Sequence, residues 1–157
     1  WIHFLELRDD NHAQKEIQAQ FRQQQEKLTY YIIALCVSAI GFSLYNTMGK
    51  SLNWHQLPLG IAVLSWAVSI YLGITAIKYR ISSLFANNVY IDIVEGRHPD
   101  VGNNPHNIQI GVKAMEQVFE HNSNRSKSIF FWQERLFYGG MILFIVWHIL
   151  EMVKNTT

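Results

Sequence analysis

The sequence predicts an all-α integral membrane protein in which two to three transmembrane helices extend into a cytoplasmic helical bundle. Charged residues make up only 16% of the 157 residues, against about 25% in a typical soluble domain. Three uncharged runs interrupt the chain, and a helix needs about 20 apolar residues to span a bilayer. The stretches that flank the runs are polar, show helical spacing and contain few Gly and Pro residues, which favours helices.

The first predicted element is a glutamine-rich cytoplasmic helix over residues 1–28. Its central part, residues 10–27, contains no Gly or Pro, and a narrow apolar stripe recurs at helical spacing. The stripe consists of Ala13, Ile17, Phe21 and Leu28. We expect Asp10 or Asn11 to cap the start of this helix, which then continues into the first membrane span.

The first two uncharged runs are the clearest transmembrane segments. Residues 28–49 provide 22 uncharged positions, and residues 51–77 provide 27. Both runs exceed the length that crosses the hydrocarbon core of a bilayer. We therefore predict transmembrane helices at 29–49 and 57–78.

The next polar stretch, residues 79–135, is predicted to be a cytoplasmic helical region. Apolar spacing carries the second span onward as a helix until Gly96 and Pro99 end it. After a turn-rich loop, a further helix is expected from Ile108, with a break or bend at residues 122–124. The helical arms that leave the membrane would then stand together as a bundle.

The third uncharged run, residues 136–150, has only 15 positions. Glu151 and Lys154 can reach an interface with their charged ends, which lengthens the usable apolar segment. We predict a third transmembrane helix at 136–153, and a half-buried or re-entrant helix is the open alternative. His148 and Glu151 share a face of this helix and are interpreted as interfacial anchors.

Lysine and arginine residues determine the predicted orientation. Four of them precede the first span, one lies in the loop 46–56, seven lie in residues 78–135 and one lies in the tail. Under the positive-inside rule, the N-terminus and residues 79–135 are cytoplasmic. The net charge of +1 gives no reason to expect nucleic-acid binding from bulk charge.

Small residues within the spans indicate where helices approach one another. Ser65, Ser69 and Gly73 recur every four residues on the second span, and Ala34 lies on the first. This pattern is typical of closely packed membrane helices. Packing within one chain and packing between copies of the chain both remain open.

Polar residues on the first helix predict a surface that faces water. The candidates for lining a pore are Gln18, Gln25, Ser38, Ser43 and Asn46. Neutral amides and hydroxyls in a ring of such helices would line a wide, weakly selective pore; glutamines that simply face water are the alternative. No charged residue lies in the middle of the first two runs, which argues against proton relays and voltage sensing.

Motifs for metal binding and catalysis are scarce. No Walker loop, dinucleotide fingerprint or metalloprotease motif occurs, and the lone Cys36 excludes a thiolate zinc site. His98, Asp100 and His106 are metal-ligand types, but their irregular spacing in a turn-rich loop favours solvated polar residues. We therefore infer no metal, no cofactor and no small-molecule substrate.

Arg8 and His12 are the one candidate pair for acid–base catalysis. Arg8 and His12 are four residues apart and share a helix face, so that arginine could hold a phosphate while histidine moves a proton. An ordinary exposed pair is the alternative interpretation.

The layout of a polar N-terminal helix, two closely spaced spans and a long helical region resembles the small membrane accessory proteins of type VI-B CRISPR systems. It is also similar to the two-span SLATT-type effectors of prokaryotic defence. The first resemblance implies a divergent HEPN-type Arg…His motif and multimeric pores that depolarise membranes. It further implies the inner membrane of a bacterium, with an RNA-guided nuclease complex or its RNA as a partner.

Three functions follow as hypotheses. The first is a homo-oligomeric membrane pore or membrane-depolarising effector in antiviral defence, without enzymatic activity and embedded in the lipid bilayer. The second is a membrane-anchored HEPN-like ribonuclease that uses Arg8 and His12. The third is a non-enzymatic membrane scaffold that recruits a cytoplasmic partner.

Overall fold

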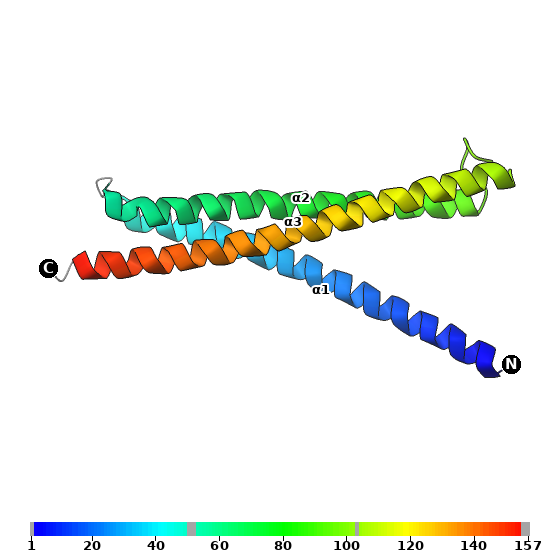
Figure 1. The fold of residues 1–157 in the computed structure, drawn as a ribbon, viewed down its shortest axis with the longest axis horizontal. Coiled ribbons are helices and arrows are strands. Elements are labelled where there is room, and N and C mark those ends of the chain that lie inside the picture. Colours follow the sequence, from blue (N-terminus) through cyan, green and yellow to red (C-terminus); the bar gives the residue numbers. More distant parts are fainter. Residues whose placement is uncertain (1, 50–52, 103, 155–157) are drawn as a thin grey trace.

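The computed structural model describes residues 2–49, 53–102 and 104–154, with the side chains of these ranges apart from those of 2–15, 18, 19 and 22. Within these ranges the chain is all-α and contains no strand (Figure 1). The elements are helix α1 (Ile2–Thr47), the 3-10 turn η1 (Trp54–Gln56), helix α2 (Leu57–Val94) and helix α3 (Pro105–Lys154). The predicted fold class is confirmed.

Helix α1 joins the glutamine-rich arm and the first predicted span without interruption. Its start differs from the prediction, because the helix already begins at Ile2 and Asp10 and Asn11 lie inside it. Residues 2–9 contain no Gly or Pro, so nothing in them prevents an upstream start. The helix ends at Thr47, just before Gly49, whose φ of 78° is a conformation that suits glycine.

Helix α2 ends where its sequence predicts. Gly96 has a φ of 68°, which takes the chain out of the helix. The backbone N–H groups of Arg97 and His98 both donate to the carbonyl of Asp92, at 2.8 and 3.1 Å. The Arg97 side chain forms ion pairs with Asp92 and Glu95, so the end of the helix is closed by backbone and side-chain contacts.

Helix α3 runs for 50 residues without interruption, so a break at residues 122–124 is wrong, while the alternative of a bend there stays a prediction. Asn122 is buried, and its Nδ2 atom donates to the hydroxyl oxygen of Ser82 on α2 at 3.3 Å. The low helix propensity of Ser and Asn amounts to only about 0.7 kcal/mol or less per residue, which packing against a neighbouring helix can outweigh.

All three helices lie together in one half of the molecule, and only α1 leaves the other two in the other half. Helices α2 and α3 lie side by side, antiparallel, over most of their length, while the N-terminal half of α1 diverges from both (Figure 1). The predicted helical bundle beyond the spans therefore consists of the α2–α3 pair, and the glutamine-rich arm stands apart from it.

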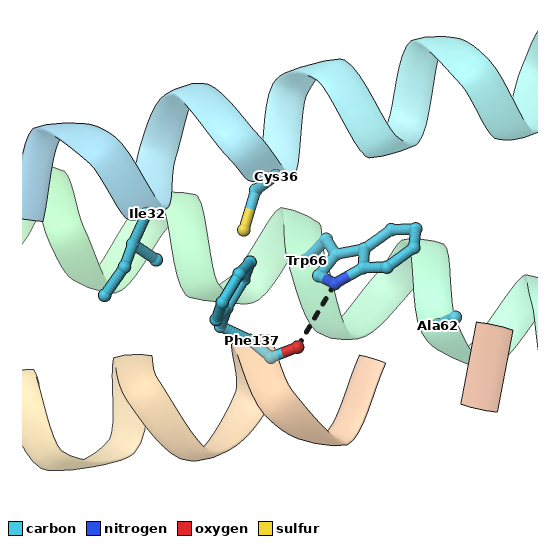
Figure 2. Close-up of a cluster of buried hydrophobic side chains, with 5 residues drawn as sticks. All are labelled: Ile32, Cys36, Ala62, Trp66 and Phe137. Atoms are coloured by element: carbon cyan, nitrogen blue, oxygen red, sulfur yellow. Dashed lines mark hydrogen bonds between the residues drawn. The ribbon is translucent and has the colours of Figure 1, made fainter. Parts of the chain in front are cut away.

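The hydrophobic core lies where all three helices meet. One buried cluster contains residues from each helix: Ile32 and Cys36 of α1, Ala62 and Trp66 of α2, and Phe137 of α3 (Figure 2). The buried positions of α2 continue along one seam at alternating spacings of three and four residues, as in left-handed helix packing. This seam consists of Leu59, Ala62, Trp66, Ser69, Gly73 and Ala76.

The outer surface of the molecule suits a lipid environment. Each of the three long helices contains a segment that is long and apolar enough to cross a membrane, including α3. Large apolar side chains cover the outside, among them Leu64, Tyr71 and Ile142, which are 67%, 68% and 63% exposed. A soluble domain rarely leaves so much apolar surface in water, so association with a membrane follows.

Candidate functional site

Two hydrogen bonds from α2 to the backbone of α3 fix the register of the two helices. The indole N–H of Trp66 donates to the carbonyl of Phe137 at 3.3 Å, and the hydroxyl of Ser69 donates to the carbonyl of Gln133 at 2.9 Å (Figure 2 shows the first). The two carbonyls lie about one turn apart on α3. Gly140 lies directly against the Trp66 side chain, and a Cβ atom built on Gly140 would lie 2.5 Å from the indole nitrogen.

Gln133 is a polar side chain fully enclosed between the helices. Its exposed fraction is 0%, and neither amide atom has a hydrogen-bond partner in the described part of the chain. It fits because Gly73 lies opposite, where a Cβ atom would approach its Nε2 atom to 2.5 Å. The buried Cys36 thiol lies near Ser69, so polar groups from all three helices meet at this level.

The small residues that the sequence singles out divide between the inside and the outside of the chain. Ser69 and Gly73 are buried against the other two helices, and Ser65 is half-buried. Ala34 is exposed, so it does not take part in packing within the chain. Ser69 and Gly73 therefore pack inside one chain, whereas packing of Ala34 against another copy stays a prediction.

The candidates for pore lining also divide. Ser38 is exposed, while Gln25 and Asn46 are half-buried. Ser43 is only 1% exposed and donates to the carbonyl of Ala39 at 2.7 Å, and its role in lining a pore stays a prediction. It lies five residues from Ser38, about 140° around the helix, which turns it toward α2. The side chain of Gln18 lies outside the described residues.

Two charged residues, Glu134 and Arg135, lie deeper than the predicted boundary at residue 136 implies. The Ser69–Gln133 bond places their neighbour Gln133 at the level of Ser69. Ser69 is nine residues from Lys78, the charge that ends the second apolar run, which corresponds to about 13 Å along the helix. On a hydrocarbon core about 30 Å thick with Lys78 at its edge, the level of the two charges corresponds to the middle.

Neither charge points into the core of the chain. Arg135 is exposed and lies 4.1 Å from the centre of the Phe131 ring, and Glu134 is half-buried. Arg135 is two residues from the enclosed Gln133, about 200° around the helix, and therefore on the outer face of α3. Sequence reasoning missed this pair because the two charges stand just outside an apolar run, where they resemble an ordinary helix end.

Another cation, Arg80, lies where α1 begins to leave the other helices. It is half-buried, and its Nη1 atom has no hydrogen-bond partner among the described residues. Burial lowers the pKa of Arg80, and the nearby Glu26 and Tyr30 of α1 raise that pKa. An arginine stays charged in either case, so Arg80 attracts the acidic residue of α1 at the point of divergence.

The remaining sequence candidates form no site within the described side chains. The side chains of Arg8 and His12 lie outside the described residues, so their pairing stays a prediction. In the loop after α2, the Nδ1 atom of His98 accepts the backbone N–H of Asp100 at 3.3 Å. Within the described ranges, no group of three or more His, Cys, Asp and Glu residues could hold a metal ion. His148 is exposed on α3.

Comparisons with known proteins add no assignment. No protein-family model matches the chain, and neither a curated protein sequence nor a solved structure matches it.

Proposed function

We propose that this protein is a homo-oligomeric membrane pore, or membrane-depolarising effector, of the bacterial inner membrane. One inference carries the proposal: the register of α3 against α2 puts the half-buried Glu134 and the exposed Arg135 at the level of the middle of the second apolar run. A charged side chain at that depth costs about 2.5–3.5 kcal/mol in insertion experiments, and such residues almost always face a partner or a water-filled cavity. An assembly of copies supplies either one.

The part of a single chain that the structure describes offers no path of its own. Its three-helix core is filled by Trp66, which is 2% exposed, and by Cys36, which is fully buried. Protein interiors packed in this way leave no continuous passage for water or ions. Any conducting path therefore runs between copies of the chain.

The first span presents a surface on which copies can approach closely. Ala34, Ser38 and Gly41 are exposed at spacings of four and three residues, and no atom lies within 4 Å of a Cβ built on Gly41. Small residues on one face let the backbones of two membrane helices come into contact. The hydroxyl of Ser38 donates to the carbonyl of Ala34, so its donor has a partner even on a surface that faces lipid. The hydroxyl oxygen can still accept a hydrogen bond where the surface faces water.

The biological setting rests on the layout of the chain. Its resemblance to accessory proteins of type VI-B CRISPR systems and to SLATT-type effectors supports a role in prokaryotic antiviral defence, beside an RNA-guided nuclease or its RNA. The basic residues of the N-terminal arm and of residues 79–135 support a cytoplasmic location for these parts. No feature of the described residues favours the ribonuclease or the scaffold hypothesis over the pore.

The test combines particle mass and permeability. We expect the full chain in mild detergent to sediment as a multimer, and vesicles that contain it to release an enclosed dye. A monomeric particle together with intact vesicles would overturn the proposal.

A pair of glycine variants provides the matched control. Gly41→Leu should reduce both the multimer and the dye release, because it fills the close-approach surface of α1. Gly60→Leu, at an exposed position of α2 that also has open space around it, should leave both unchanged. Equal effects of the two substitutions would contradict the assignment of the α1 surface.

A further inference from the structure

We infer that Glu134 of one copy pairs with Arg135 of the next copy within the membrane, so that these two residues hold the assembly together. The inference rests on the proposed function and names its subunit contact. It starts from the adjacency of the two charges on the outer part of α3, where the described chain provides no ion-pair partner for either.

The two charges share one depth in the bilayer. Consecutive helix residues differ by only about 1.5 Å along the axis, and the Ser69–Gln133 bond sets that level near the middle of the second span. Copies that insert in the same orientation carry Glu134 and Arg135 at the same height. A ring of such copies therefore brings opposite charges to one level at every subunit contact.

The two side chains leave α3 in different directions. Successive residues are about 100° apart around a helix, so Glu134 faces one flank while Arg135 faces away from the core of its own chain. Two complementary patches on different sides of one helix form a head-to-tail contact, in which each copy offers its acid to one neighbour and its base to the other. This geometry favours a pair between chains over two isolated charges in lipid.

The surroundings of Arg135 suit such a contact. Phe131 lies one turn away, with its ring 4.1 Å from the guanidinium carbon, and orients the side chain. An arginine can bind a carboxylate through two parallel hydrogen bonds, which are strong where water is excluded. A second copy of this chain is therefore the partner that supplies the missing carboxylate at the right height.

Charge-reversal variants of the full chain test the pairing. Glu134→Arg and Arg135→Glu should each lose the multimer peak in mild detergent and should no longer release dye from vesicles. The double variant Glu134→Arg/Arg135→Glu carries the same two charges in exchanged places and should recover both properties.

Coexpression of the two single variants separates assembly from folding. One chain then carries two arginines and the other two glutamates, so an alternating ring restores every pair. We expect the mixture to form multimers although neither variant does so alone, which chains that merely fail to fold would not do.

Four results would overturn the inference. Single variants that keep the multimer but change ion preference would show that the charges line the pore instead. A double variant or a mixture that stays dissociated would exclude the pairing. A wild-type chain that is itself monomeric and leaves vesicles intact would overturn the proposed function. A wild-type multimer that persists in both charge-reversal variants would overturn only the pairing of Glu134 with Arg135.

Discussion

At the scale of single residues, the close approach of α2 and α3 depends on residues that lack bulk or carry a donor. The side chains of Trp66 and Ser69 donate hydrogen bonds to carbonyls of the facing helix, at 3.3 and 2.9 Å. Such bonds need the two backbones to come near each other, and Gly73 and Gly140 make the room. The sequence reveals Gly73 through its spacing, whereas Gly140 stands beside Gly139 and only the structure separates their roles.

The adjacent glycines of α3 allow a sharp comparison. A Cβ at position 140 would lie 2.5, 2.8 and 3.0 Å from three atoms of the rigid Trp66 indole, whereas one at position 139 meets nothing within 4 Å. Gly140→Ala should therefore lower the unfolding free energy by about 1–3 kcal/mol through overpacking. Gly139→Ala should leave it unchanged or raise it by up to about 1 kcal/mol, because alanine favours a helix.

The measurement is the thermal unfolding midpoint in one detergent, followed by tryptophan fluorescence. A Gly140→Ala protein as stable as the wild type would show that Trp66 does not lie over this glycine. A matching loss in Gly139→Ala would point to an effect of helix flexibility instead of the indole contact.

At the scale of elements, α3 shows how packing overrides local sequence signals. Its stretch Asn122, Ser123 and Asn124 has the composition of a helix break, yet the helix continues through it. The side chain of Asn122 is buried and bonds to Ser82, so the neighbouring helix supports the segment. The glutamine-rich arm of α1 is the opposite case, because its local helical signals extend the helix where Figure 1 shows no neighbouring helix beside it.

A proline substitution tests the continuity of α3. Asn124 is exposed and lies mid-helix, so Asn124→Pro should destabilise the protein by about 3 kcal/mol or more, since proline removes a backbone bond and clashes with the preceding turn. Asn124→Ala should have little effect on stability. Circular dichroism and the unfolding midpoint report both changes, and a tolerated proline would indicate that the helix is broken here.

At the scale of the whole molecule, three helices that can each cross a membrane predict a topology that experiments can test. An odd number of crossings places the two ends of the chain on opposite faces. The distribution of basic residues predicts that the loop after α1 and the C-terminal tail are outside. A re-entrant third segment would instead leave the tail on the same side as the N-terminus.

Cysteine labelling in intact cells checks this topology. In a Cys36→Ser background, a membrane-impermeant maleimide should label Asn53→Cys and Thr156→Cys from outside. It should label Pro99→Cys, in the loop between α2 and α3, only after lysis. Labelling of Thr156→Cys only after lysis would contradict a third crossing.

The sequence alone determined the all-α class, the long helices and the apolar segments, because these properties depend on residues close together in the chain. The helix end at Gly96 belongs to the same group, since it follows from local backbone conformation.

Only the tertiary structure decided the level of Glu134 and Arg135 along α2, the burial of Ser43 and the division of the small residues between buried and exposed positions. These depend on the register between helices, which contacts such as Ser69 with Gln133 set across 64 positions of the sequence. A shift of α3 by two turns would leave every local pattern unchanged and would return both charges toward the edge of the apolar band.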